Sequence, residues 1–245
     1  MSLVLVTGAS RGFGRALALA FTEELSAANE GDLYLHLWSR DTAGLAATTE
    51  AIQATWKSQD QALHATQTAV DLSDQRAYCD TINNFLSDIA KLSLKRIVIV
   101  HNAGSLGEVG RIANVSSPQA NQKHMELNVN SVLWFNKRFL EAYGQASSGE
   151  KPHICSMSVL SMPSNHLLHV VSTASSKVYL PRIFSKPCLL AARDMHFRVV
   201  AIEEPNVKTL NYAPGPMETE MNNALRTGPS TDASLQTMFQ KLHAE

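Results

Sequence analysis

The sequence is poor in cysteine, in charged residues and in long apolar runs. Its 245 residues include only three cysteines, Cys79, Cys155 and Cys188, without C-x-x-C spacing. Neither a disulfide framework nor a structural zinc site is expected from them, and no metal is predicted. Reduced thiols are typical of the cytosol, so the chain is predicted to be cytoplasmic.

Charge and hydropathy argue against further classes of partner. The formal net charge is −1 and no block of like charges occurs, which argues against binding to nucleic acid or an anionic membrane. No apolar run approaches the ~20 residues of a membrane span, and the N-terminal MSLVLVTGAS lacks the pattern of a signal peptide. The partners predicted are a small molecule and a second copy of the chain, with no nucleic acid and no membrane.

What the sequence does contain is a regular alternation of strand-like apolar runs and stretches of helical period. Strands are predicted, in chain order, over 3–6, 33–38, a run ending at Val70, 96–100, 153–155 and 207–212. Helices are predicted over 16–25, 41–57, 74–90, 117–146 and 187–203. These successive βαβ units predict an α/β fold, a single Rossmann-like domain with a doubly wound parallel sheet.

The domain is predicted to span 1–221, with 222–245 as a C-terminal tail. Within this domain, residues 157–190 show neither the alternation of a strand nor the periodicity of a helix, and they include three prolines. This segment is therefore predicted to be irregular. One of the prolines, Pro187, suits the first turn of a helix, which places the start of that helix near residue 186.

TGASRGFG (7–14) stands between the first apolar run and a helix. Gly8 permits a sharp turn, Gly12 lets the backbone approach a pyrophosphate, and Gly14 allows close packing. Free amides and the positive end of the helix dipole then face the phosphates. An ordinary tight turn is the alternative, but the strand before and the helix after favour a dinucleotide site. The predicted cofactor contacts here are Gly8, Ala9, Ser10, Arg11, Gly12, Phe13 and Gly14.

The residues after the second strand favour NADP, in its reduced form NADPH, over NAD. An acidic residue at this place binds the ribose hydroxyls of NAD, whereas an arginine suits the 2′-phosphate of NADP. Here the strand is followed by Arg40 and Asp41, and Arg11 adds a second cation. Two solvated surface arginines are the alternative, and Asp41 leaves NAD open. Arg40 and Asp41 are both predicted to contact the cofactor.

Two later strand ends supply further candidates. Asp71 and Leu72 follow the third strand, where a carboxylate can bind the adenine amino group; a plain strand-end turn is the alternative. HNAG (101–104) ends the fourth strand at the carboxyl edge of the sheet, where open α/β sheets bind ligands. From this motif, cofactor contacts are predicted at Asn102, Ala103 and Gly104.

The sequence resembles the short-chain dehydrogenase/reductase family in TGASRGFG, HNAG, LNVNS (127–131) and NYAPGPMETEM (211–221). AARDM (191–195) and AIEEPN (201–206) resemble a narrower branch, which reduces pterin side-chain carbonyls with NADPH in tetrahydrobiopterin biosynthesis. The resemblance covers about 1–156 and 191–221. It implies an NADPH-dependent oxidoreductase, a pterin carbonyl compound as substrate, and a homodimer formed by two long helices of each subunit.

The resemblance also implies roles for individual residues. The family's structural asparagine corresponds to Asn128 and its active-site serine to Ser156. From spacing alone, a helix-interior amide and a strand-end hydroxyl are the alternatives. The substrate is expected at Ser156, Met157 and Gly215. The nicotinamide side of the site corresponds to Gly215, Pro216, Met217, Glu218, Thr219 and Glu220.

The chain departs from the family at the proton donor. A phenol can donate the proton when a neighbouring ammonium lowers its pKa, and Tyr and Lys at i and i+4 share one helix face. The corresponding positions here are Lys186 and Leu190, and no Tyr-x-x-x-Lys occurs in the chain. Tyr179 lies before the predicted helix. The family's last strand and its acidic pterin anchor also have no counterpart before KLHAE (241–245).

These departures leave three hypotheses open. The chain is an active reductase, or a catalytically inactive NADP-binding homologue that acts at most as a dimer partner, or the product of aberrant splicing or a faulty gene model with foreign sequence at about 157–190. Sequencing the transcript across that segment tests the third. The apolar surface over 123–143 suits a dimer, although covering its own sheet is the alternative.

Overall fold

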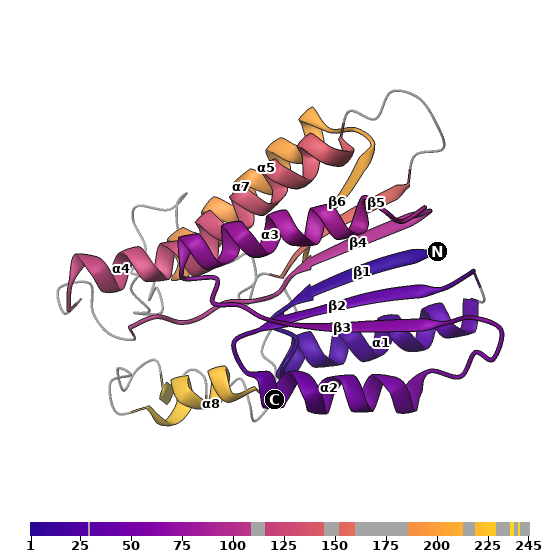
Figure 1. Cartoon of the computed structure of the whole chain (residues 1–245). Coiled ribbons are helices and arrows are strands. Elements are labelled where there is room, and N and C mark those ends of the chain that lie inside the picture. The colour runs from indigo at the N-terminus through magenta and orange to yellow at the C-terminus, as the bar shows by residue number, and fades with distance from the viewer. Residues whose placement is uncertain are drawn as a thin grey trace.

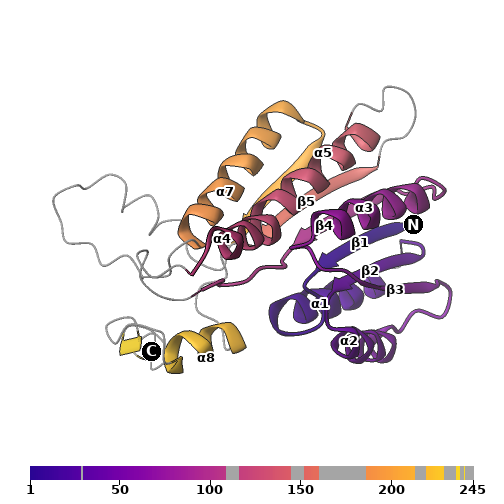
Figure 2. The same ribbon diagram turned by 60° about the vertical axis from the view of Figure 1, so that its left-hand side comes forward.

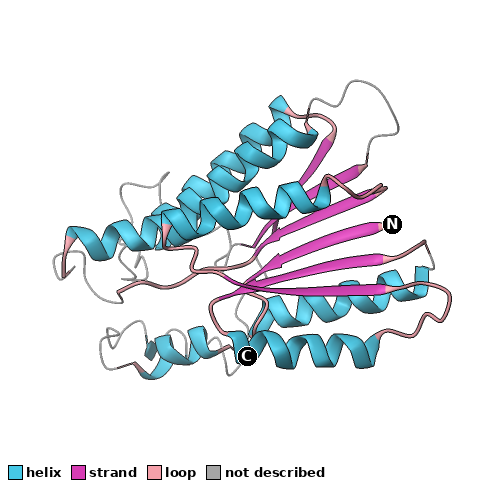
Figure 3. Cartoon of the chain, viewed as in Figure 1, coloured by secondary structure: helices cyan, strands magenta, loops and turns pink. Residues whose placement is uncertain are grey.

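The computed structural model describes residues 1–28, 30–108, 116–144, 152–159, 186–212, 219–228, 236–237 and 240. Its strands are β1 (Ser2–Thr7), β2 (Leu33–Ser39), β3 (Leu63–Ala69), β4 (Arg96–His101), β5 (His153–Val159) and β6 (Val207–Tyr212). Its α-helices are α1 (Gly12–Ala28), α2 (Thr42–Thr55), α3 (Gln75–Ile89), α4 (Pro118–Met125), α5 (Ser131–Tyr143), α7 (Lys186–Glu203) and α8 (Glu220–Thr227). Strands and helices alternate along most of the chain (Figure 3).

The strands form one parallel sheet in the order β3-β2-β1-β4-β5-β6. Helices α1 and α2 cover one face, and α3, α5 and α7 cover the other (Figures 1 and 2). The chain reverses its direction of progress through the sheet between β1 and β4, which is where open α/β sheets bind ligands. Helices α4 and α8 lie beyond the carboxyl ends of the strands (Figure 1). The predicted Rossmann-like, doubly wound fold is confirmed.

Burial on both faces of the sheet explains the uninterrupted apolar runs of the central strands. In β1, alternate side chains enter two different cores because successive residues of a strand point to opposite faces. Leu3 and Leu5 pack with Phe135 of α5, on the side of α3, α5 and α7. Val4 and Val6 pack with Leu45 of α2, on the side of α1 and α2.

Local capping fixes where several helices begin. Asp41, Asp74 and Ser117 have extended backbones, and each side chain accepts a hydrogen bond from the backbone N–H three residues later. Such N-caps satisfy amides that the first helical turn leaves without partners. Pro118 follows Ser117 in the first turn of α4, where its missing N–H costs nothing.

The predicted end of β5 is wrong, and so are both ends of the segment predicted to be irregular. Strand β5 continues to Val159 rather than ending at Cys155, because its later residues hydrogen-bond in register with both β4 and β6. Helix α7 begins at Lys186, as the position of Pro187 predicts. The prediction of irregular chain over 157–190 is therefore wrong at both ends, and 160–185 lies outside the described residues.

The helix predicted over 117–146 is divided. Between α4 and α5 the chain forms a π-helical turn, Glu126–Asn130, and α5 ends at Tyr143. A π-helical turn inserts extra backbone into a helix and is frequent at functional sites. Within the described part of the chain, no helix has both the length and the apolar character needed to cross a membrane.

Candidate active site

A cavity of about 740 Å³ opens at the carboxyl edge of the sheet, where the connections after β1 and β4 diverge. It is walled by the glycine loop, the ends of β2 and β4, the π-helical turn, the end of β5, α7 and the start of α8. Most of the predicted site residues line it: Gly8, Ser10, Arg11, Gly12, Phe13, Gly14, Arg40, Asp41, Leu72, Asn102, Ala103, Gly104, Asn128, Thr219 and Glu220. Residues far apart in sequence thus meet at one place.

The glycine loop has the backbone that the sequence predicts. Gly8 and Gly12 have φ angles of 70° and 53°, in the left-handed region that favours glycine. A Cβ on Gly14 would lie 2.2 Å from the backbone oxygen of Gly8, so only glycine fits there. A Cβ on Gly12 would meet nothing nearer than a Thr219 methyl at 3.8 Å. Gly12 therefore leaves space in front of the N-terminus of α1.

A set of hydrogen bonds holds the ends of β1 and β4 together beneath this loop. The Asn102 side-chain amide donates to the backbone oxygens of Thr7 and Gly8 at 3.0 and 3.3 Å. The Thr7 hydroxyl in turn accepts from the backbone N–H groups of Asn102 and Ala103, both at 3.0 Å. The motif HNAG therefore fixes the shape of the glycine loop in addition to lining the cavity.

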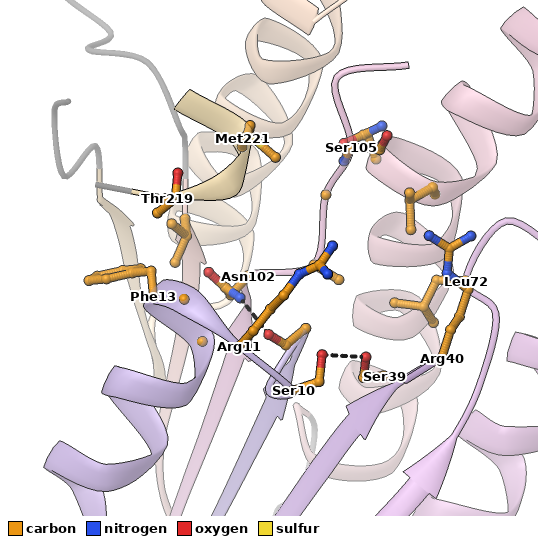
Figure 4. Close-up of a pocket in the computed structure, with 18 of the residues that line it drawn as sticks. Ser10, Arg11, Phe13, Ser39, Arg40, Leu72, Asn102, Ser105, Thr219 and Met221 are labelled. Atoms are coloured by element: carbon orange, nitrogen blue, oxygen red, sulfur yellow. Dashed lines mark hydrogen bonds between the residues drawn. The ribbon is translucent and has the colours of Figure 1, made fainter. Parts of the chain in front are cut away.

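The rim of the cavity carries two arginines, one from the loop and one from the end of β2. Figure 4 shows the side chains of Arg11 and Arg40 extending over the cavity. The neighbouring residues Ser10 and Ser39 are joined by a hydrogen bond, in which the Ser39 hydroxyl donates to the Ser10 hydroxyl at 2.9 Å. Arg11 forms an exposed ion pair with Glu220, at 2.9 Å. The Arg11 guanidinium can bind a phosphate with two hydrogen bonds once the phosphate replaces the Glu220 carboxylate.

Two carboxylates lie near these arginines. Asp71 is 3.7 Å from Arg40, and its pKa is lowered, because hydrogen bonds from Ser73 and the charge of Arg40 outweigh the effect of burial, which would raise it. Asp41 lines the rim, but its carboxylate accepts from the Gly44 N–H at 2.9 Å and caps α2. The sequence pattern could not show that Asp41 has this second task.

The π-helical turn presents Asn128 to the inner part of the cavity. The Asn128 side-chain oxygen accepts from the Ser105 backbone N–H at 3.1 Å, and its amide donates to the His124 backbone oxygen at 2.9 Å. Glu126 fixes the turn from the other side, where it accepts from the Tyr78 hydroxyl at 2.8 Å. Burial first, and this bond second, raise the pKa of Tyr78. Tyr78 is therefore held as a neutral donor to Glu126.

The predicted substrate residues on β5 lie behind the cavity wall. Ser156 is buried and its hydroxyl has no hydrogen-bond partner among the described residues. Neither Ser156 nor Met157 lines the cavity. Because β5 is longer than expected, Val159 reaches the wall instead. Ser158 shares a sheet face with Ser156, lies nearer the carboxyl edge, and also has a buried hydroxyl without a partner. Both serines are visible in the sequence. Which of them lies nearer the carboxyl edge of the sheet depends on where β5 ends, and only the structure shows that.

Helix α7 contributes two residues that the pattern did not single out as site residues. Leu190 and Arg193 both line the cavity. Arg193 is only 1% exposed, and its guanidinium donates to the backbone oxygens of His101 and Ala103. Burial lowers the pKa of Arg193 to about 10. In the sequence, Arg193 was noted only as part of AARDM, a motif that supports the family resemblance. Helical periodicity alone does not show whether an arginine is buried or exposed.

Some predicted residues do not line the cavity, and others lie outside the described residues. Ala9 is fully buried and does not line the cavity. Asp71, after β3, does not line it either but lies beside Arg40. Among the described residues no tyrosine lines the cavity, and no group of three His, Cys, Asp or Glu side chains is arranged to hold a metal. Outside the described residues lie Tyr179, Gly215, Pro216, Met217 and Glu218.

Comparison with known proteins gives consistent results. Residues 2–177 match the family model described as short chain dehydrogenase. Sepiapterin reductase of Meriones unguiculatus is 29% identical over 245 residues, covering 100% of this chain and 84% of the relative. Sepiapterin reductase of Rattus norvegicus is 30% identical over 251 residues, with the same coverage. An alcohol dehydrogenase from the archaeon Thermococcus sibiricus, complexed with 5-hydroxy-NADP, superposes with a TM-score of 0.63 at 19% identity, covering 100% of this chain and 89% of that one.

Proposed function

The chain belongs to the short-chain dehydrogenase family, and on that premise we propose that it is an NADPH-dependent reductase of pterin side-chain carbonyls, acting in tetrahydrobiopterin biosynthesis. The observation that carries the cofactor part is the glycine turn at the N-terminus of α1 with Arg11 and Arg40 on the rim beside it. The substrate part rests on the relatives named sepiapterin reductase, which are similar along the whole chain.

The cavity fits a dinucleotide phosphate. The missing Cβ of Gly12 leaves room for a pyrophosphate against the first amides of α1. Arg11 and Arg40 line the cavity and would bind a 2′-phosphate, and Leu72 would give the adenine an apolar wall. Thr219 would face the nicotinamide half. When bound, this cofactor supplies a hydride from C4 of its nicotinamide.

The inner part of the cavity would receive the substrate. We propose that Asn128 shapes this part through its bond to the Ser105 N–H and that a β5 serine hydroxyl contacts the carbonyl group. Ser156, the residue predicted from the resemblance, does not line the cavity, so its contact with the carbonyl would require a shift at the end of β5. Leu190 and Val159 would give this part of the cavity an apolar wall.

The test measures binding and turnover separately. NADPH and NADH are titrated by fluorescence, and oxidation of NADPH is then followed with sepiapterin as the carbonyl substrate. Submicromolar to micromolar binding of NADPH, weaker binding of NADH and steady turnover are expected. Gly14→Asp should abolish all of them, because the Gly8 backbone and the Asn102 side chain leave no room for a side chain there. Absence of NADPH binding contradicts the proposal entirely.

A second candidate function is supported by one observation at the same place. Leu190, an apolar residue, occupies the wall where the family pattern has a lysine, and no described tyrosine lines the cavity. We therefore also propose the alternative of a catalytically inactive NADP-binding homologue. Tight NADPH binding without turnover above a no-enzyme control selects this candidate, and turnover with sepiapterin removes it.

Either candidate is proposed to be a homodimer. On α7, Met195, Val199 and Ile202 follow a helical spacing that places them on one face, and Ile202 is 82% exposed. An apolar stripe of this kind, beside α5, suits a second copy of the chain. Light scattering after gel filtration should show a dimer that Ile202→Glu weakens. A monomeric wild-type chain contradicts the proposal.

A further inference from the structure

Arg193 carries a positive charge that is buried beside the cavity. It is 1% exposed, and within the described part of the chain no carboxylate lies within ion-pair distance of it. The adjacent Asp194 is engaged elsewhere, with Arg198 and Asn211, each at 2.8 Å. Burying a charge without a counter-charge is costly, so a residue of this kind requires an explanation.

Partnerless polar atoms gather around this arginine. His101, Ser158 and Asn211 lie in register on three neighbouring strands, at the carboxyl edge of the sheet. Arg193 donates to the His101 backbone oxygen, and Asn211 donates to Asp194, so α7 lies over this row. The Arg193 Nε, the Ser158 hydroxyl and the Asn211 side-chain oxygen are buried and have no hydrogen-bond partner among the described residues. Buried polar atoms of this kind are normally satisfied.

A purely structural role accounts for only part of these observations. Arg193 joins α7 to the end of β4 through the backbone oxygens of His101 and Ala103. A neutral amide can donate such bonds as well, without the cost of a buried charge. The charge itself, and the unsatisfied Nε, remain unexplained by that role. The position of Arg193 in the cavity wall, beside Leu190, connects them with a ligand.

We propose that Arg193 is a catalytic residue that binds the carbonyl oxygen of the substrate; this inference rests on the proposed reductase function. When a carbonyl carbon receives a hydride, the C=O π pair moves onto the oxygen, which becomes an alkoxide and then takes a proton from water. A guanidinium that is already in place stabilises this negative charge without reorganisation. Arg193 would thereby do electrostatically part of what a tyrosine and lysine pair does by proton donation.

Three variants separate charge from structure. Arg193→Gln keeps hydrogen-bond donors for the strand carbonyls and removes the charge, whereas Arg193→Lys keeps the charge and loses the planar fork. Arg198→Gln is the matched control, since Arg198 is an exposed arginine of the same helix. Thermal unfolding and NADPH titration of each variant establish that it is folded and binds cofactor, with an expected change in NADPH Kd of less than about threefold.

Turnover and substrate binding then give the result. For Arg193→Gln, kcat with sepiapterin should fall roughly 100-fold with little change in KM, as for the loss of one oxyanion donor, and Arg193→Lys should recover about a tenth or more of the wild-type rate. Arg198→Gln should match the wild-type chain. A wild-type chain that binds NADPH and sepiapterin without turnover overturns the catalytic role of Arg193 together with the proposed reductase function.

The possible failures are distinguishable. Wild-type rate and sepiapterin affinity in Arg193→Gln, in a chain that binds both NADPH and sepiapterin, overturn the catalytic role of Arg193 and leave the proposed function intact. Equal losses in Arg193→Gln and Arg193→Lys also overturn it, because they show that the fork and its backbone bonds matter rather than the charge. A wild-type chain that binds no sepiapterin refutes the proposed function, and the inference with it.

Discussion

Replacing Gly14 and Gly12 by alanine should separate the two tasks of the glycine loop, which are to pack and to leave space. At Gly14 a Cβ would lie 2.2 Å from the Gly8 backbone oxygen and 2.4 Å from the Asn102 side-chain nitrogen. Relief requires a movement of roughly 1 Å, which disturbs the bonds from Asn102 to Thr7 and Gly8. Overpacking and the lost hydrogen bonds together should lower the free energy of unfolding of Gly14→Ala by about 2–4 kcal/mol.

Gly12→Ala should lose less stability than Gly14→Ala, and its main effect should be on NADPH binding. Its Cβ has open space, with Thr219 at 3.8 Å, so the loss of stability is limited to the left-handed backbone at φ 53°, about 1–2 kcal/mol. The added methyl group, however, fills the space in front of the first amides of α1. NADPH affinity should therefore fall at least about tenfold, the equivalent of ~1.4 kcal/mol.

Urea unfolding of the two variants and NADPH titration by fluorescence test this pair. The reasoning is refuted if Gly14→Ala unfolds at the same urea concentration as the wild-type chain, or if Gly12→Ala binds NADPH as tightly. Ala51→Gly, an exchange in α2 away from the loop, is a suitable control, because it should lower stability by about 1 kcal/mol and leave affinity unchanged.

Three further outcomes follow from individual contacts. Glu220→Gln frees Arg11 from its exposed ion pair and should tighten NADPH binding by up to about fivefold, with no change for NADH in the same titration. Asp41→Ala removes the N-cap of α2 and should lower the free energy of unfolding in urea by about 1 kcal/mol. Burial lowers the pKa of His36 to about 4 and of His101 to about 3, from 6.5, so below pH 6.5 the unfolded chain binds more protons and stability falls as pH falls. Between pH 6.5 and 5 each histidine should remove at most about 2 kcal/mol, and urea unfolding that is unchanged over this range contradicts the assignment.

The parts of the fold set by local periodicity could be predicted from the sequence. The apolar runs at 3–6 and 96–100 predicted strands, and β1 and β4 are the central pair of the sheet. The glycine loop was also predictable, because the left-handed backbone at Gly8 and the absence of room at Gly14 are demands that glycine alone meets. These features depend on a few neighbouring residues, so they are visible in the sequence.

Features that depend on distant contacts could not be predicted in the same way. The length of β5 comes from pairing with both β4 and β6, and it moved the end of the strand from Cys155 to Val159. The burial of Arg193 depends on backbone oxygens about ninety residues earlier in the chain. The π-helical turn at Asn128 is held by Glu126 and by Tyr78 of another helix. The prediction of Ser156 as the active-site serine stays a prediction.

The π-helical turn affects which changes in length the chain can accept. Five residues in a wider turn shift the phase of everything that follows, so Asn128 lines the cavity while Phe135 and Phe139, on the same continuous segment, pack into the core against α3. The segment formed by the π-helical turn and α5 thereby serves the ligand with its first part and the hydrophobic interior with its second. Deleting one residue within 126–130 would restore the ordinary phase and misplace one of the two halves, whereas a substitution at an exposed position would leave both intact. Insertions and deletions should therefore be far rarer than substitutions in this turn.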